Sequence, residues 1–361
     1  MNIINHQEAY LSMIKHFVLL VMLAVSLAGC DTVGYYGQGI QGQYSVWKVR
    51  VPLAKALDNP GLTDLQRRHL QQVARIRAFA SEQLHLPIKH EYDTYADVGR
   101  RYVAWIVMAA PAYALEPRTW CYPLVGCLDY HGFFSQNKAT RYALALKRQG
   151  MDVYVAPVQA YSTLGWFRDP VLNGFLNLDE PEMAELIFHE LAHQKLFFKG
   201  DTAFNESFAN AVAEEGLRRY AEAYHLDLTA WQEHQNAQHQ VMQLLMQTRQ
   251  SLAAIYRRAE SIDQMQLEKH KALQLLQSRF LEQARQQPSL QQFATFVAHA
   301  NNASLASAAD YHDLVPLFQA MLQHDGGDLQ KFFSDCAELK HIHPAARRAA
   351  LTQWVKEYSH D

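Results

Sequence analysis

The sequence predicts a mainly α-helical protein of the α+β class with a small β-sheet, and three observations support this prediction. Residues 228–287 contain almost no Pro or Gly and are rich in Gln, Ala, Leu and Met, as expected for long amphipathic helices. Residues 102–110 and 152–158 are apolar, β-prone runs that predict two buried strands. The chain of 361 residues is 49% hydrophobic, so it can bury a substantial core in one large or two small domains.

The first residues have the pattern of an export signal. The charged segment Met13-Ile14-Lys15-His16 precedes an apolar run over residues 17–27. This run is shorter than the ~20 apolar residues that span a bilayer. We therefore predict a signal peptide rather than a transmembrane helix.

The segment Leu27-Ala28-Gly29-Cys30 resembles the bacterial lipobox, in which signal peptidase cuts before the cysteine and the thiol carries diacylglycerol. The resemblance implies a lipoprotein signal peptide over residues 1–29 and a lipid on Cys30. It also implies a protein anchored by that lipid in the bacterial cell envelope, facing the periplasm. An ordinary signal peptide that happens to contain Cys30 is the alternative.

The N-terminal part of the mature chain is expected to join a tether to a small α+β region. Residues 30–45 are rich in Gly and Tyr and predict a tether, and residues 46–84 predict a helical stretch broken at Asn59-Pro60-Gly61. A helix at 138–149 should lie between the two buried strands.

Two further helices are predicted on either side of a short turn at Gly200-Asp201. Pro181 opens the first helix, which extends to about Phe198. The second extends from about residue 203 to 224, with Asp201 or Thr202 as its N-cap. A long helical hairpin should follow from Leu228, and then shorter helices divided at 301–302 and 326–327.

Three cysteines remain once Cys30 is assigned to the lipid anchor. An exported chain enters an oxidising compartment, so Cys121 and Cys127 are the natural disulfide pair. A metal site from these two is less favoured, because no second Cys or His pair accompanies them. We expect Cys336 to be a free, buried thiol.

The charge balance argues against nucleic acid as a partner. The chain carries 33 basic and 36 acidic residues and has a formal net charge of -3. It contains no basic stripe and no nucleic-acid-binding signature.

The segment His189-Glu190-Leu191-Ala192-His193 lies on the first of the two predicted helices. Residues four apart share a helix face, so His189 and His193 can bind one metal ion while Glu190 lies beside it without ligating it. Catalytic zinc takes three protein ligands and leaves a position for water. Glu206, near the start of the second helix, is the predicted third ligand.

These segments resemble known peptidase families. His189 to Gln194 followed by Asn205-Glu206-Ser207-Phe208-Ala209 resembles the gluzincins of the aminopeptidase N family, in which the glutamate of the second segment is a zinc ligand. The gap between the two segments is shorter here, so the connection between the helices must differ. The closer resemblance is to a bacterial family of predicted aminopeptidases, typically lipoproteins. It rests on the segments 119–127, 161–166, 189–194 and 201–207 and covers most of the mature chain.

The resemblance implies a zinc peptidase, with Zn²⁺ as cofactor and a peptide as substrate. It implies a zincin-like catalytic core over residues 46–225 and a helical C-terminal region over 226–361 that could cover the cleft. In such enzymes zinc activates a water molecule, and Glu190 would serve as general base and then as general acid.

Roles for residues around the metal are expected with alternatives. Asn210 and Glu214 follow Glu206 at helical spacing and could hydrogen-bond a ligand histidine, or they could be ordinary solvated residues. Tyr311 could stabilise an oxyanion, with the neighbouring His312 as the other candidate, or could pack between helices. Tyr161-Ser162-Thr163-Leu164-Gly165 could hold the substrate backbone as an edge strand, or simply connect a strand to a helix.

The sequence leaves three functions open. The leading prediction is a lipid-anchored zinc peptidase, and the family resemblance implies that it is an aminopeptidase. An endopeptidase acting on misfolded envelope proteins or peptidoglycan-linked peptides is the second. The third is an adaptor or scaffold built on the Gln-rich helices of 228–287, with a metal site that is merely structural.

Overall fold

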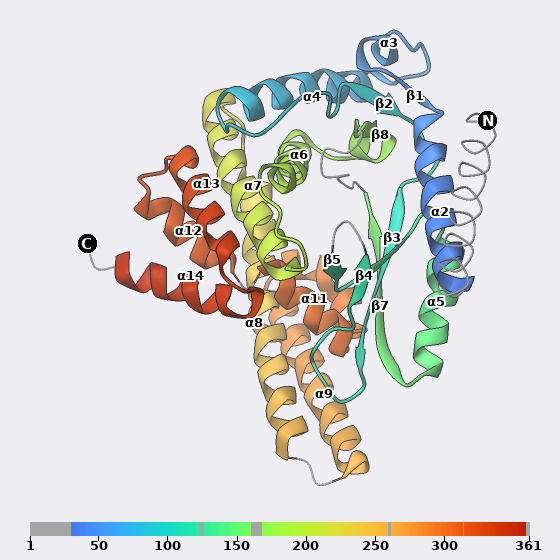
Figure 1. Ribbon diagram of the computed structural model, residues 1–361, viewed down its shortest axis with the longest axis vertical. Coiled ribbons are helices and arrows are strands. Elements are labelled where there is room, and N and C mark those ends of the chain that lie inside the picture. The colour runs from blue at the N-terminus through green and yellow to red at the C-terminus, as the bar shows by residue number, and fades with distance from the viewer. Residues whose placement is uncertain (1–29, 123–125, 160–167, 259–260, 313, 359–361) are drawn as a thin grey trace, which may run out of the picture. The chain divides into compact units, whose positions relative to one another are not determined.

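The computed structural model describes residues 30–122, 126–159, 168–258, 261–312 and 314–358 (Figure 1). For residues 30–33, 310–312, 345 and 358 it describes the backbone alone. The predicted signal peptide and the predicted substrate-binding segment Tyr161 to Gly165 lie outside the described residues. Among the residues described, no helix combines the length and the apolar character needed to cross a membrane.

Among the described residues, those from Cys30 to Lys48 belong to one unit, and those from Val49 onward belong to a second. The first contains α2 (Cys30–Trp47), where the sequence predicts a tether. The prediction of a tether did not include a helix in this segment. It rested on the glycines, each of which costs a helix about 1 kcal/mol relative to alanine. The Tyr, Gln and Ile residues between the glycines are compatible with a helix, and local propensity is a weak guide when both kinds alternate.

The second unit begins with a small sheet. β1 (Arg50–Pro52) pairs antiparallel with β2 (Thr94–Ala96), which pairs in parallel with β8 (Val171–Leu172). β1 lies inside the stretch predicted to be helical, which is therefore interrupted. A strand of three residues is too short for alternation to reveal it, and its partners lie far along the chain.

Two helices follow β1, and the second of them packs against the helix that carries the histidine motif. They are the short α3 (Leu53–Leu57) and α4 (Asp64–Glu82). Thr63 begins α4 with a capping box, in which its hydroxyl accepts from the backbone of Gln66 and the Gln66 side chain accepts from the backbone of Thr63. α4 packs against both α6 (Glu180–Lys195) and the 3-10 helix η1 (Asn173–Asn177).

The central sheet is antiparallel, with β3 (Ala104–Pro111) between β6 (His131–Phe133) and β7 (Met151–Val158). β3 and β7 are the two strands predicted from the apolar runs. α5 (Gln136–Arg148) and α11 (Asn302–His312) both pack against β3 and β7, and Figure 1 shows them on opposite sides of the sheet. A separate hairpin consists of β4 (Trp120–Tyr122) and β5 (Gly126–Leu128).

The helices α6 and α7 (Thr202–Tyr224) form the most extensive helix pair of the fold. Asp179 caps α6 through a capping box with Glu182, and Asp201 caps α7, as the sequence predicts for that helix. A Cβ atom added to Gly216 would lie 2.9 Å from Cδ2 of Phe188, so glycine at this position lets the two helices approach closely.

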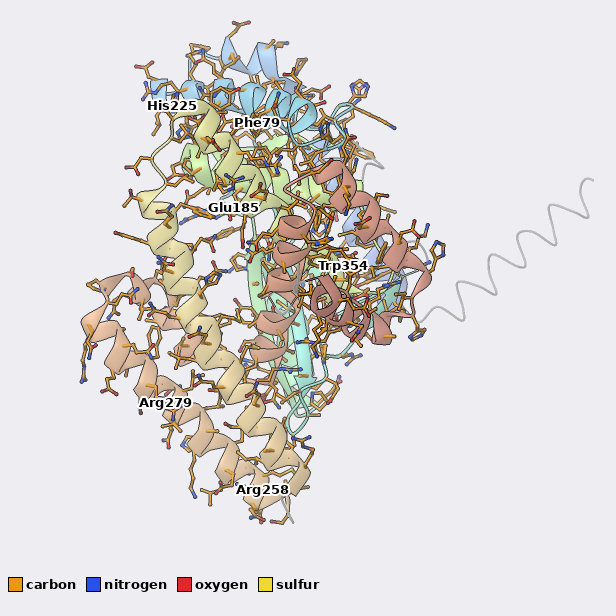
Figure 2. The ribbon with its side chains drawn as sticks, turned by 90° about the vertical axis from the view of Figure 1, so that its left-hand side faces the viewer. Phe79, Glu185, His225, Arg258, Arg279 and Trp354 are labelled. Atoms are coloured by element: carbon orange, nitrogen blue, oxygen red, sulfur yellow. A yellow bond between two sulfur atoms is a disulfide. The ribbon has the colours of Figure 1, made fainter. Side chains whose placement is uncertain are left out.

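The regular elements described in the C-terminal half are all helices. α8 (Thr229–Arg258) and α9 (Ile262–Gln286) form the predicted hairpin, which Figure 2 shows as two long helices running side by side, with Arg258 near its tip. The hairpin has an apolar cluster that includes Leu245, Leu252 and Phe280. The remaining elements are η2 (Pro288–Phe293), α10 (Ala294–Ala298), α11, α12 (Val315–His324), α13 (Leu329–Glu338), η3 (Leu339–His341) and α14 (Pro344–Tyr358).

These C-terminal helices belong to the same unit as the rest of residues 49–361. α11 and α12 pack against α7, and α11 also packs against α8. Cys336 in α13 is a free, buried thiol, as predicted.

Asn302 ties the start of α11 to the central sheet. Its amide nitrogen donates to the backbone oxygens of Pro111, Ala112 and Ala114 at 2.9–3.0 Å. Its backbone N–H donates to the carboxylate of Asp152 at 2.8 Å, which also accepts from Lys269 of α9 at 2.6 Å. The Asn-Asn element that divides two helices in the sequence is thus a structural junction between α9, α11 and the ends of β3 and β7.

Candidate metal centre

The structure brings the three predicted ligands together at the facing surfaces of α6 and α7. The Nε2 atoms of His189 and His193 are 3.2 Å apart. Oε2 of Glu206 lies 3.4 Å from Nε2 of His189 and 3.5 Å from Nε2 of His193. Their ligand atoms all lie within 4.8 Å of one another, which makes this group a candidate metal site among the described residues.

The size of this triangle suits a tetrahedral metal ion. Zinc lies about 2.0–2.1 Å from histidine nitrogen and carboxylate oxygen, so two such donors around a tetrahedral ion are roughly 3.3 Å apart. The three distances between the donor atoms are 3.2, 3.4 and 3.5 Å. Two imidazoles and one carboxylate, already converging, are a donor set that zinc accepts.

The site is mostly buried, with side-chain exposures of 16% for His189, 9% for His193 and 10% for Glu206. Burial acts to raise the pKa of Glu206, but the charge of His193 and hydrogen bonds from both histidines outweigh it and lower the pKa to about 2. The carboxylate is therefore ionised at neutral pH. Nδ1 of His193 is buried and has no hydrogen-bond partner among the described residues.

Glu190 has the opposite electrostatic character. Burial raises its pKa to about 7; the charge of His189 lowers it, and the carboxylates of Glu206 and Asp169 add to the increase. A carboxyl group with a pKa near neutrality can both accept and donate a proton at physiological pH. Two carboxylates at one site, one firmly ionised and one near neutrality, are a common arrangement for acid–base work.

Tyr92 and Asp169 are neighbours of Glu190. The sequence did not indicate Tyr92, and it offered Asp169 only by its charge, as one of several acidic residues that could bind a substrate amine. Burial raises the pKa of Tyr92, and the negative charges of Glu190 and Asp169 raise it further. The backbone N–H of Tyr92 donates to the backbone oxygen of Asp169 at 2.7 Å. Tyr92 has a φ of +58°, a left-handed conformation that is rare for a bulky residue and is often found near functional sites. No sequence signal marks it, because it precedes the motif by almost a hundred residues.

The turn between α6 and α7 is held by specific contacts. Asn205 accepts from the backbone N–H of Phe198 at 2.7 Å and donates to the Phe198 oxygen at 2.8 Å. Arg347 of α14 donates to the Asp201 carboxylate at 2.6 Å and lies over the Phe198 ring. The turn that separates the histidines from Glu206 is thus fixed from within and from the C-terminal helix.

Asn210 and Glu214 lie one and two turns beyond Glu206 on α7, as the spacing requires. The carboxylate of Glu214 accepts from Gln319 of α12 at 2.5 Å. Burial and the charge of Glu185 raise its pKa to about 7. Glu185 lies one turn before His189 on α6 and accepts a hydrogen bond from Trp231 at 2.9 Å.

The other predicted site residues differ in how far the structure describes them. Cys121 and Cys127 form a disulfide across β4 and β5. Tyr311 and His312 end α11, but their side chains lie outside the described part of the chain. Cys30 begins α2, where only the backbone is described.

The sequence of the chain matches a known protein family. A family model described as "Putative aminopeptidase" matches residues 34–351, which include His189, Glu190, His193 and Glu206. The chain belongs to this family. Membership supports peptidase activity as the general function. No curated protein and no solved structure matches the chain.

Proposed function

We propose that this chain is a zinc-dependent peptidase. The observation that carries the proposal is the convergence of His189, His193 and Glu206, with ligand atoms within 4.8 Å of one another and Glu190 on the same helix. Membership in the family described as "Putative aminopeptidase" also supports peptidase activity. A zincin-like core, with the motif helix paired to the helix of the third ligand, is part of this proposal.

In the proposed site His189, His193 and Glu206 hold Zn²⁺. A zinc ion in such a site lowers the pKa of water to about 7 and polarises a carbonyl oxygen. Glu206 brings the negative charge that a cation needs in a buried place, because its pKa is about 2 and it stays ionised. The turn contacts of Asn205 fix this carboxylate relative to the histidines before any ligand binds.

Glu190 moves the proton in this proposal. Its carboxylate takes a proton from the attacking water and returns it to the nitrogen of the leaving amine when the peptide bond breaks. Its pKa of about 7 suits both halves of this task. The positive charge of a bound ion would shift the balance towards the carboxylate, the form that must act first.

Replacement of Glu190 by Gln tests the enzyme hypothesis. We expect the E190Q protein to bind zinc at wild-type stoichiometry and to lose peptide hydrolysis by on the order of 100- to 10,000-fold. Glu222→Gln is a matched control, since Glu222 lies on α7 with a side chain that is 78% exposed. Full activity of E190Q would contradict the proposal and favour a scaffold with a structural metal site.

Aminopeptidase activity is the finer part of the proposal and rests on the family description. An aminopeptidase must bind the free amine of its substrate, and an endopeptidase need not. N-acetylated and free peptides of the same sequence separate the two activities. We expect the free peptide to be cleaved and the acetylated one to resist; equal rates would indicate an endopeptidase of the cell envelope.

The proposed location is the bacterial cell envelope, with lipid on Cys30 and the catalytic unit facing the periplasm. The lipobox-like sequence before Cys30 supports it. The C30S protein should leave the membrane fraction, whereas Cys336→Ser, at a buried free thiol, should not change fractionation. Unchanged membrane association of C30S would contradict lipid anchoring.

A further inference from the structure

The disulfide-linked β4–β5 hairpin lies directly against the turn that connects the two ligand helices. Cys121 and Cys127 face each other in the hairpin register and are joined by the disulfide. Gly126 immediately precedes Cys127 and has a φ of +86°. The turn opposite contains Lys199 and Gly200, with Gly200 at a φ of +76°.

The two backbones touch at these glycines. A Cβ atom added to Gly126 would lie 2.9 Å from the backbone nitrogen of Gly200 and 2.6 Å from Cγ of Lys199. A Cβ atom added to Gly200 would lie 3.8 Å from the backbone nitrogen of Cys127. The first of these distances is too short for a real side chain, so any residue larger than glycine at position 126 must displace the turn.

A second contact extends this interface onto the first residue of α7. Asp129 follows β5, and burial raises the pKa of its carboxyl group. The hydroxyl of Thr202 acts in the opposite direction, and the charge of Asp201 adds to the effect of burial, so the carboxyl group lies close to both residues. The hairpin therefore meets the turn at its middle and α7 at its N-terminus.

The position of this turn sets the distance between the ligands. His193 is near the end of α6, and Glu206 lies in the second turn of α7. Asn205, next to Glu206, is the residue that bonds both backbone groups of Phe198 within the turn. A shift of the turn would therefore move the carboxylate of Glu206 relative to the two imidazoles, which are fixed on a single helix.

We propose that the disulfide hairpin is a positioning element of the metal site: through Gly126 it holds the α6–α7 turn in the place that brings Glu206 to the two histidines. The inference rests on the proposed zinc site and adds the elements that set its geometry. Gly126 and the two cysteines of the disulfide are not among the candidate metal ligands. They act through the turn, so their loss should weaken metal binding more than it weakens the fold.

The test compares the zinc affinity of variants of the full-length protein by competition with a chromophoric chelator. Gly126→Ala is the probe. Gly150→Ala is the matched control, because Gly150 has a φ of +78° but a Cβ atom there would meet nothing within 4 Å. The two changes cost a similar backbone strain, and the approach to Gly200 is what differs. We expect G126A to weaken zinc binding by on the order of tenfold and G150A to leave it unchanged.

Reduction of the disulfide provides a second measurement that does not depend on folding a variant. A phosphine reductant, checked for zinc binding in a protein-free blank, should weaken the zinc affinity of the folded wild-type protein in the same direction. Each zinc affinity is measured at a temperature where the sample is folded by circular dichroism. The free energy of unfolding is measured separately in the presence of a chelator.

The outcomes separate this inference from the proposed function. Wild-type protein that binds zinc, with G126A and the reduced protein weakened and G150A unchanged, supports the positioning role. Wild-type protein that binds zinc, with G126A equal to G150A and no effect of reduction on affinity, overturns it and leaves the proposed function standing. Wild-type protein that binds no zinc overturns the proposed site, and the positioning role with it.

Discussion

Asn205 holds Phe198 by both of its backbone groups. Its Oδ1 accepts from the Phe198 N–H at 2.7 Å, and its Nδ2 donates to the Phe198 oxygen at 2.8 Å. Asn205 is buried, with 2% of its surface exposed, and Phe198 is almost as deeply buried. The residue that precedes the third candidate ligand thus closes the turn that returns the chain from α6 to α7.

Replacement of Asn205 by Ala should destabilise the protein by about 2–4 kcal/mol, because it leaves a buried donor and a buried acceptor without partners. Urea denaturation in the presence of a chelator measures this loss apart from metal binding. Asn137→Ala, at an exposed position of α5, is the control and should change the free energy of unfolding by less than about 0.5 kcal/mol. A cost for N205A no larger than for the control would contradict the clamp.

Replacement of Glu206 by Ala should weaken zinc affinity by at least about 100-fold, because it removes one of three donors and the negative charge of the site. Zinc should also stabilise the wild-type protein, by about 4 kcal/mol at a thousandfold excess of free zinc over the dissociation constant. Competition titration and thermal unfolding with and without chelator measure these effects. Glu222→Ala on the same helix is the control; unchanged affinity in E206A would exclude it as a ligand.

Glu214 should make the stability of the protein depend on pH. Burial and the charge of Glu185 raise its pKa from 4.5 to about 7. The folded state therefore holds this proton more tightly than the unfolded state, and the resulting stabilisation is present below pH 4.5 and lost as the pH rises to about 7. Above that pH the ionised, buried carboxylate destabilises the fold.

Replacement of Glu214 by Gln should remove this effect. We expect the free energy of unfolding of E214Q to exceed that of the wild type by on the order of 1–3 kcal/mol at pH 8, and the two to converge near pH 5. Denaturation with chelator at both pH values measures the difference, with Glu222→Gln as an exposed control on α7. An equal difference at pH 5 and pH 8 would show that Glu214 has an ordinary pKa.

Replacement of Asn302 by Ala should destabilise the fold by about 2–3 kcal/mol without changing zinc affinity. The side-chain amide of Asn302 donates hydrogen bonds to the backbone oxygens of Pro111, Ala112 and Ala114. These oxygens would lose their donor in the variant. None of the hydrogen-bond partners given for Asn302 is a candidate metal ligand. Denaturation and zinc competition on the same preparation check both parts, and a large loss of zinc affinity would assign the element to the site.

The residues of the candidate site could largely be predicted because their spacing in the sequence matches the turn of a helix. His189, Glu190 and His193 follow one another within a single helix, and the return of Glu206 requires just a short turn. Tyr92 and Asp169 were not predictable. They reach Glu190 from loops distant in the sequence, and neither carries a motif or a periodic pattern.

The pattern of apolar residues alone determined the long helices and the two strands β3 and β7, and the spacing of His189 and His193 placed both on one face of α6. Each of these features is set by contacts within a few residues. The tertiary structure decided what depends on distant segments. It placed β1 beside β2 where a helix was expected, gave Asn302 a structural part, and set the disulfide hairpin against the α6–α7 turn. The physical reason is that a backbone contact such as that between Gly126 and Gly200 produces no periodic pattern in either sequence segment. Glycine is required at position 126 because the neighbouring backbone leaves no space for a side chain.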